Sequence, residues 1–488
     1  MHRNLTLSVG LIVASLWPLH SQPSAVSFRA VQSELFAAPN SLVNAAADTD
    51  GDTDLDLFVG FNGTPNRLYR NDGGTFTDVA VAAGLNAARA TRAAAFGDWD
   101  GDGDSDLLVG YAPGSGPVLT LYRNDRGVFT DVTSSARLAV DAGAVRQVVW
   151  VDYDDDGDLD LFVAFRDRAN ALFLNDAGTL TDIAASIGLA DTRRSVGAVW
   201  ADLDADGDLD VVVGNMDGDA NGVFRNHNGR FTDVAELWGL ASGGQTPRAA
   251  VNGTVRPCVG DLNNDGHLDV VMANYGPPAL FLRQGDGWSD VASAWGIAVD
   301  SRSDACVLGD VNHDGAVDLY LNGTVTGGRN WPDYLYVQKA NRLVDQIPQD
   351  VAAIPADHGA LLLDLSGDGA LDLALTGQGP HALLVNTLDA ALARRSVRVQ
   401  VVDSRGRANK PGAEVRVYRA GTRQLLGMAL VDAGSGYNAQ SVAPVHIGLA
   451  SANRVDIEVT WPAGGKREVT YARNIQVDGR RITTVKVR

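Results

Sequence analysis

The chain has 488 residues, of which 45% are apolar, and a formal net charge of −20. It is therefore long enough for more than one domain and can bury a large core. The charge is uneven: residues from Arg394 onward include 17 Lys and Arg against 7 Asp and Glu, whereas the preceding part has 23 against 53. This change places a domain boundary near residues 388–394. The acidic surface of the first part argues against a nucleic-acid partner.

The N-terminus predicts export. A basic start, MHRN, precedes a 13-residue apolar run from Leu5 to Trp17, which is too short to cross a bilayer. Residues 1–25 are therefore interpreted as a signal peptide, with the exact cleavage site left open. No later run is long and apolar enough for a transmembrane segment. We expect a secreted, periplasmic or cell-surface protein.

A dense acidic stretch, DYDDDGDLDLF at residues 152–162, has the spacing of a cation-binding loop. Aspartates stand at its positions 1, 3, 5 and 9, and Gly157 occupies position 6, where a left-handed backbone is easiest. Calcium takes six to eight oxygen ligands, and the EF-hand loop opens with the same D-x-D-x-D-G. The following β-rich run predicts a strand where an EF-hand would have a helix. An acidic surface turn without an ion is the alternative, but such a turn does not need oxygen at four fixed positions.

The pattern occurs seven times, with first aspartates 50, 54, 50, 59, 49 and 54 residues apart, which indicates a repeat architecture. We expect calcium as the cofactor, up to seven ions with one per loop. Loops two, three and four should bind most tightly; loop one has Thr53 at position 6 and loop seven has Ser366 at position 3, so one of these should bind most weakly. The predicted ligands, loop by loop, are Asp48, Asp50, Asp52 and Asp56; Asp98, Asp100, Asp102 and Asp106; Asp152, Asp154, Asp156 and Asp160; Asp202, Asp204, Asp206 and Asp210; Asp261, Asn263, Asp265 and Asp269; Asp310, Asn312, Asp314 and Asp318; and Asp364, Ser366, Asp368 and Asp372.

Each repeat predicts a four-stranded sheet. A small or apolar run precedes each loop, a β-rich run follows it, and a hairpin signature such as LYRNDGGTFTDV from Leu68 completes the unit. Seven such sheets arranged radially form an all-β, seven-bladed β-propeller, assigned to residues 26–390. The last repeat lacks its final strand, and residues 26–35 match that strand in pattern. We expect the N-terminal segment to complete the last sheet and close the ring.

Five basic side chains precede the acidic loops by five to eight residues: Arg92, Arg146, Arg194, Arg256 and His358. In a propeller they would converge on one mouth of the channel, opposite the calcium loops. Arginine there could hold a carboxylate or sulfate in bidentate fashion. We expect an acidic glycan or an extracellular or periplasmic protein as partner. The alternative is that each basic residue pairs with an aspartate of a neighbouring blade.

The two cysteines, Cys258 and Cys306, precede the loop aspartates of adjacent repeats by three and four residues. An oxidising compartment permits a disulfide between them. Buried free thiols are the equal alternative, because the unequal offsets point the two side chains differently.

The repeats resemble FG-GAP and VCBS repeats, which are related to the propeller of integrin α-subunits. The second repeat has FG at Phe96 and GYAP from Gly110 beside its acidic loop. From Arg394 on, the chain resembles the ASPIC/UnbV domain of bacterial FG-GAP proteins and of the cartilage acidic protein family, through GYNAQS (residues 436–441), HIGLA (446–450) and VTWPAGG (459–465). The resemblance implies a small β-rich domain over residues 391–488, calcium binding outside the cytoplasm and an interaction role. It implies no catalytic residues.

These observations favour a calcium-binding module for binding, adhesion or assembly. A calcium-dependent polysaccharide-active enzyme, a lyase or hydrolase, is the first alternative. The chain lacks G-x-S-x-G and H-E-x-x-H, and its eight histidines are scattered, which argues against it. A purely structural surface-display protein is the second alternative. The identity of the ligand and the oligomeric state stay open.

Overall fold

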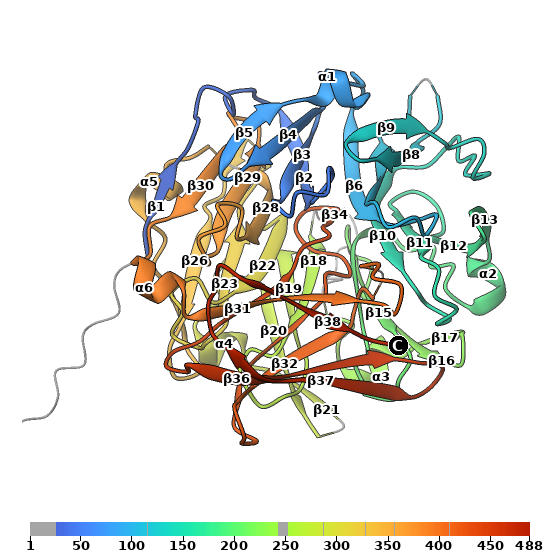
Figure 1. The fold of residues 1–488 in the computed structure, drawn as a ribbon. Coiled ribbons are helices and arrows are strands. Elements are labelled where there is room, and N and C mark those ends of the chain that lie inside the picture. The colour runs from blue at the N-terminus through green and yellow to red at the C-terminus, as the bar shows by residue number, and fades with distance from the viewer. Residues whose placement is uncertain are drawn as a thin grey trace, which may run out of the picture.

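The computed structural model describes residues 26–114, 116–242, 252–285, 287–326, 328–355, 357–408 and 410–488. The predicted signal peptide lies outside these residues. The described part is built from strands and six one-turn helices, so the all-β prediction is confirmed (Figure 1). No helix in these ranges is long and apolar enough to cross a membrane. The helices are α1 (Ala80–Ala83), α2 (Ala184–Ile187), α3 (Ala235–Trp238), α4 (Ala292–Trp295), α5 (Gln349–Ala352) and α6 (Ala390–Ala393).

Each of the first six acidic repeats forms an antiparallel sheet of four strands. The inner strand precedes the acidic loop, the second strand follows it, and a hairpin supplies the third and fourth. From repeat one to repeat six the sheets are β2–β5 (Ser41–Ala47, Asp56–Phe61, Arg67–Asp72, Thr75–Asp78), β6–β9 (Thr91–Gly97, Asp106–Tyr111, Leu119–Asp125, Val128–Asp131), β10–β13 (Val145–Val151, Asp160–Phe165, Ala171–Asp176, Thr179–Asp182), β14–β17 (Ser195–Ala201, Asp210–Asn215, Gly222–His227, Arg230–Asp233), β18–β21 (Gly253–Gly260, Asp269–Tyr275, Ala279–Gln284, Gly287–Asp290) and β22, β23, β26 and β27 (Ala305–Gly309, Asp318–Asn322, Tyr334–Gln338, Leu343–Asp345). A small hairpin, β24 (Val325–Thr326) and β25 (Arg329–Asn330), lies between β23 and β26.

The composition of the strands follows their burial. The inner strand β2, SLVNAAA, is buried at every residue, whereas the outer strand β5, TFTD, buries only its phenylalanine. Small side chains let neighbouring sheets approach closely where they converge. Gly97 at the end of β6 illustrates this, because a Cβ there would come within 2.6 Å of Cδ1 of the fully buried Trp150. The core is therefore a series of apolar layers between successive sheets.

The inner strands form a closed series of contacts, here called the ring. Each of β2, β6, β10, β14, β18, β22 and β28 (Asp357–Leu363) contacts the next, and β28 contacts β2. A disulfide between Cys258 and Cys306 joins β18 to β22, which decides between the two alternatives for these cysteines.

The N-terminal strand closes the last sheet, as the sequence predicts. β1 (Phe28–Ala30) pairs antiparallel with β30 (Ala382–Asn386), Phe28 opposite Asn386, in the order β1, β30, β29 (Asp372–Gly377), β28. Phe28 is buried, whereas Arg29 is exposed. The first strand of the described chain therefore covers an edge that would otherwise be unpaired.

The strands after α6 form two further sheets, and this part of the chain is here called the C-terminal domain. Figure 1 places its strands, coloured orange to red, together across one end of the repeat sheets. One short strand, β34, leaves these sheets and pairs in parallel with β6 inside the ring. The first sheet consists of β35 (Val445–Gly448), β31 (Ser396–Val402) and β38 (Ile482–Lys486), the second of β33 (Leu425–Leu430), β32 (Glu414–Arg419), β36 (Arg454–Pro462) and β37 (Arg467–Gln476), and β34 is Ala439–Gln440.

The closing strand can be tested by substitution. Phe28→Ala should lower the free energy of unfolding by about 3 kcal/mol, the usual cost of truncating a buried phenylalanine. Arg29→Ala, at the exposed neighbouring position, should change it by less than about 0.5 kcal/mol. Urea unfolding measures the free energy of unfolding of both variants.

Deleting residues 26–35 should expose the edge of β30 and cause aggregation, detected by light scattering. A deletion variant that stays monomeric and melts at the original temperature would contradict closure by β1.

Candidate metal-binding loops and the plug of the ring

The aspartate at position 9 of each acidic loop fixes the loop to its own sheet. It is the first residue of the second strand and is fully buried. In loop three, Asp160 Oδ2 accepts the backbone N–H of Tyr153 at 3.2 Å, and its Oδ1 accepts that of Asn175 on the third strand at 2.8 Å. Asp56, Asp106, Asp210, Asp269, Asp318 and Asp372 accept the corresponding pairs of N–H groups. Each carboxylate therefore ties loop, second strand and third strand together.

The carboxylate of the aspartate at position 1 accepts hydrogen bonds from backbone N–H groups later in the same loop, so the loop curves around it. In loop four, Asp202 accepts the N–H groups of Asp206 at 3.0 Å and of Gly207 at 3.2 Å. This turn needs a left-handed residue at position 6, and Gly207 has φ +94°. Thr53 in loop one adopts the same conformation, with φ +80°, although a β-branched residue is strained there. Loop one therefore keeps the shape of the others at a cost in backbone strain.

The loops bring carboxylate oxygens together at the predicted positions. In each of loops one to four, one oxygen from each of three aspartates lies within 4.8 Å of the other two. Several buried oxygens have no hydrogen-bond partner in the described structure, among them Asp50 Oδ1, Asp98 Oδ1 and Asp204 Oδ1. Unpaired buried oxygens beside other carboxylates suit a hard cation such as calcium. The clusters are Asp48, Asp50 and Asp52; Asp98, Asp100 and Asp106; Asp152, Asp154 and Asp156; and Asp202, Asp204 and Asp206.

Loops five to seven have a neutral oxygen at position 3, which leaves fewer carboxylates to share an ion. Asn263 and Asn312 donate their amide N–H to the position 5 aspartates Asp265 and Asp314 at 2.9 and 3.2 Å. Ser366 Oγ is buried without a partner in the described structure. The predicted ranking of the seven loops by calcium affinity stays a prediction.

Burial makes the metal-free loops favour protons. It raises the pKa of Asp160 to about 9 and that of Asp106 to about 8, against the opposing effect of the backbone N–H groups that both accept. Neighbouring loop aspartates raise both values further. A divalent cation would supply the positive charge that the proton supplies in its absence. At neutral pH, the position 9 aspartates of loops two and three therefore favour either a proton or a nearby cation.

In four of the repeats, an asparagine of the third strand links neighbouring repeats. Asn175 Nδ2 donates to the carbonyl of Trp99, at position 2 of the preceding loop, at 3.0 Å. Asn71 of repeat one donates in the same way to Leu365 of repeat seven at 2.9 Å, which carries the pattern across the closure of the ring. Asn124 and Asn386 repeat this contact with Thr49 and Val311. Sequence analysis included such an asparagine only within the hairpin signature. Its recurrence as RND in repeats one and two and as LND in repeat three was the available signal.

Basic residues of the C-terminal domain reach the position 1 aspartates. Lys410 Nζ lies 3.0 Å from Asp152 Oδ2, and Arg398 Nη1 lies 3.0 Å from Asp364 Oδ2. Arg467 Nε lies 3.2 Å from Asp202 Oδ2. All three aspartates are buried. The domain with excess positive charge is thus placed against the acidic loops, and sequence analysis did not foresee these pairs.

A segment of the C-terminal domain, residues 432–441, lies inside the ring and is here called the plug. The side chain of Gln440 acts like a strand partner for Trp150: its Oε1 accepts the Trp150 N–H at 2.7 Å and its Nε2 donates to the Trp150 carbonyl at 3.0 Å. Ser441 Oγ accepts the N–H of Ala46 at 3.1 Å. Gly434 permits the close approach, because a Cβ there would lie 2.6 Å from the carbonyl oxygen of Ala198. The plug therefore satisfies backbone groups of several inner strands.

Comparison with known families agrees with this architecture. Residues 48–109, 152–213 and 261–321 match the FG-GAP-like repeat, and residues 404–484 match the ASPIC and UnbV domain. The chain is an FG-GAP-repeat β-propeller protein with a C-terminal ASPIC and UnbV domain. This confirms the family resemblance that the sequence motifs indicate.

The relatives of this FG-GAP-repeat protein are distant. Cartilage acidic protein 1 of Xenopus tropicalis is 24% identical over 71% of the chain and 56% of its own length, and that of Homo sapiens is 25% identical over 70% and 54%. The chain thus spans little more than half of the relatives it matches. Among solved structures, the extracellular domain of a hybrid two-component system from B. thetaiotaomicron has a TM-score of 0.44 at 10% identity, covering 92% of this chain and 47% of that one.

Of the five basic residues predicted at the channel mouth of the FG-GAP-repeat ring, three lie around one side chain of the plug, Tyr437. The ring of His358 is 5.9 Å from that of Tyr437, and the charges of Arg92 and Arg146 act on its hydroxyl. His358 Nδ1 also lies 2.7 Å from Asp304 Oδ2, as the pairing alternative predicts.

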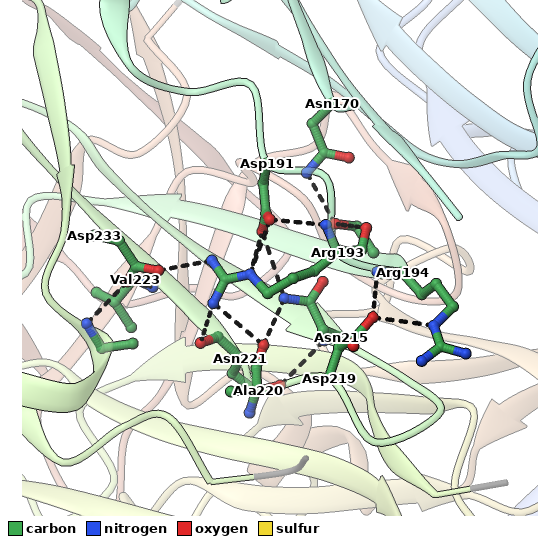
Figure 2. Close-up of polar contacts among 12 residues, drawn as sticks. Asn170, Asp191, Arg193, Arg194, Asn215, Asp219, Ala220, Asn221, Val223 and Asp233 are labelled. Atoms are coloured by element: carbon green, nitrogen blue, oxygen red, sulfur yellow. Dashed lines mark hydrogen bonds and ion pairs between the residues drawn. The ribbon is translucent and has the colours of Figure 1, made fainter. Parts of the chain in front are cut away.

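The remaining two predicted residues have structural partners. Figure 2 shows Arg194 turned towards Asp219, and its Nε lies 3.0 Å from Asp219 Oδ2. Arg256 is fully buried, and its Nη1 donates to Gln147 Oε1. Burial lowers the pKa of Arg256 to about 10, and the nearby carboxylate of Asp432 opposes this. Arg256 therefore belongs to the contact between ring and plug.

Calcium should stabilise the protein. A ligand that binds only the folded state at 100 times its Kd adds about 2.7 kcal/mol per site. Adding calcium to EDTA-treated, desalted protein should therefore raise the melting temperature in calorimetry. Asp154→Asn, which removes a charge from the loop-three cluster, should reduce this rise. Asp141→Asn, at an exposed aspartate outside the loops, should leave it unchanged. A melting temperature that calcium does not change would refute the metal assignment.

The metal-free protein should become less stable as pH rises. Asp160 has a folded pKa of about 9 against an unfolded value near 3.8, so the folded state binds the additional proton. Its contribution is fully present below about pH 4 and is lost as pH rises through about 9. The EDTA-treated protein should melt several degrees lower at pH 8.5 than at pH 6, and calcium should reduce this difference. If the melting temperature of the metal-free protein rises between pH 6 and pH 8.5, the predicted loss of stability with pH is wrong.

Proposed function

We propose that the protein is an exported, calcium-loaded, seven-bladed β-propeller that serves as a binding or assembly module. The observation that carries the proposal is the recurrence of the aspartate cluster on equivalent loops of successive sheets. Up to seven ions would occupy the loops, one in each. The closed series of inner strands supports a blade for every acidic repeat.

Export fits the chemistry of these loops. Extracellular calcium modules bind with Kd values of roughly 10⁻⁴–10⁻³ M, a concentration met outside cells and not in the cytosol. The basic and apolar start of the sequence supports the same location. Calcium outside the cell would therefore complete folding after transport.

The C-terminal domain would act as a lid on the loop end. Its Lys410, Arg398 and Arg467 share position 1 aspartates with the proposed ions. The opposite end of the ring, where the inner strands begin, would remain available to a partner. A rigid ring with one closed and one open end is suited to presenting a binding face.

Calcium stoichiometry and competition test this function. Mature protein dialysed against calcium should retain up to seven ions per chain by mass spectrometry of the metal. Lys410→Met should raise the calcium affinity of loop three several-fold, because a cation 3.0 Å from Asp152 opposes a second one. Lys486→Met, at an exposed lysine of the same domain, is the matched control.

Two results would contradict the proposal. If the protein retains fewer than two calcium ions per chain, the assignment of calcium as its cofactor is wrong. Failure of residues 1–25 to export alkaline phosphatase, a reporter that is active only outside the cytoplasm, would remove the proposed location.

A further inference from the structure

Two arginines lie side by side at the end of the ring opposite the acidic loops. Arg92 is the second residue of β6 and Arg146 the second of β10, two inner strands in contact. Each strand has a β-bulge at that point, a feature that redirects side chains. Burial lowers the pKa of Arg92, and the charge of Arg146 lowers it further, so the two guanidinium groups interact. Both are half-buried.

Neither arginine has an acidic partner. In the described part of the chain, the side chain of Arg92 bonds only to Asn62 Oδ1, at 3.5 Å, and Arg146 forms no hydrogen bond or ion pair. The Nε of Arg146 is buried and unpaired. Two unneutralised charges in this position cost free energy unless an anion binds between them.

Arg166 and Arg194, two further arginines at this end, are neutralised. Arg166 Nη2 lies 2.7 Å from Asp217 Oδ2, and Arg194 is held by Asp219. The Tyr275 hydroxyl donates a hydrogen bond to Asp304 Oδ1 at 2.8 Å, and Asp304 also contacts His358. The local acidic groups are therefore already engaged, which leaves Arg92 and Arg146 for an external anion.

Tyr437 of the plug completes this site from the C-terminal domain. Asn438 Nδ2 donates to the backbone carbonyl of Arg92 at 3.1 Å, which places the preceding residue, Tyr437, beside the two arginines. The Tyr437 ring packs against the apolar cluster of Val196, Met216 and Val255. One side of the site is thus cationic and the other apolar.

We propose that Arg92, Arg146 and Tyr437 bind a carboxylate group of an acidic peptide segment in a partner protein. Each guanidinium group can donate two parallel hydrogen bonds to a carboxylate, and the tyrosine hydroxyl can donate a further one. The apolar side formed by Val196 and Val255 fits an aliphatic side chain next to that carboxylate. A sulfated glycan would place hydroxyl groups there instead, so the peptide is favoured. The inference rests on the proposed binding role and adds the site and the class of ligand.

Calorimetry on the calcium-loaded mature protein tests the site. The probe is the peptide acetyl-Leu-Asp-Leu-Glu-amide, with acetyl-Leu-Asn-Leu-Gln-amide as its neutral match. The acidic peptide should bind and the neutral one should not. Arg92→Gln or Arg146→Gln should weaken binding by roughly tenfold each, as expected for loss of a charge-assisted hydrogen bond. Tyr437→Phe should weaken it several-fold, and the control Arg194→Gln should leave it unchanged.

The outcomes are distinguishable. Absence of binding by both the acidic peptide and a heparin hexasaccharide, or binding unaffected by Arg92→Gln and Arg146→Gln, overturns the site. A heparin hexasaccharide that binds through Arg92 and Arg146 while the peptide does not would assign the site to a sulfated glycan and overturn the peptide. Arg92→Lys keeps the charge but loses the bidentate geometry, so it should retain intermediate affinity even if Arg92→Gln folds poorly. Calcium-dependent melting of the same variants separates failure of this site from failure of the calcium role.

Discussion

Repulsion among carboxylates at one end of the ring is the constraint on which the structure depends. Every repeat brings a buried position 9 aspartate, a position 1 aspartate and further carboxylates into one short loop. Like charges a few ångströms apart in partly buried surroundings must be neutralised. The chain does so with backbone N–H groups, with Lys and Arg of the C-terminal domain, and, in our proposal, with calcium.

This constraint explains the arrangement of the two domains. The excess positive charge of the C-terminal domain faces the end where negative charge collects, so the two domains neutralise one another at their contact. The same domain sends the plug through the ring to the far end, where Tyr437 lies beside Arg92 and Arg146. One domain thus contributes to both ends of the ring.

Sequence periodicity predicts the repeat sheets well, because each depends on contacts within about fifty residues and recurs in a fixed spacing. The N-terminal closure was also predictable, since residues 26–35 carry the pattern of a missing strand. The position 9 aspartates were recognised as oxygen donors, but their pairs of backbone N–H groups follow from the sheet and not from the loop.

The contacts between the repeat sheets and the C-terminal domain could not be predicted from the periodicity of the sequence. Lys410 meets Asp152 across 258 positions, and no local pattern specifies which lysine meets which loop. The plug was visible only as the family motif GYNAQS. Its glycines were the one physical signal, because Gly434 and Gly436 both have positive φ and both lie close to inner-strand carbonyl oxygens. Arg194 and Arg256 were grouped with Arg92 by their offsets alone, and tertiary contacts separate them.

The pairing of β1 with β30 also imposes an order of assembly on the growing chain. Ser27 and Thr387 bond to each other across 360 positions, so the first strand must wait unpaired until nearly all the repeats have emerged. The entropy of closing such a loop grows slowly with its length, but non-local pairing of this kind slows folding. The plug follows later still, because residues 432–441 come after β30 in the chain. In a chain that folds from its N-terminus, β1 and β30 can therefore pair before the plug is available to enter the ring.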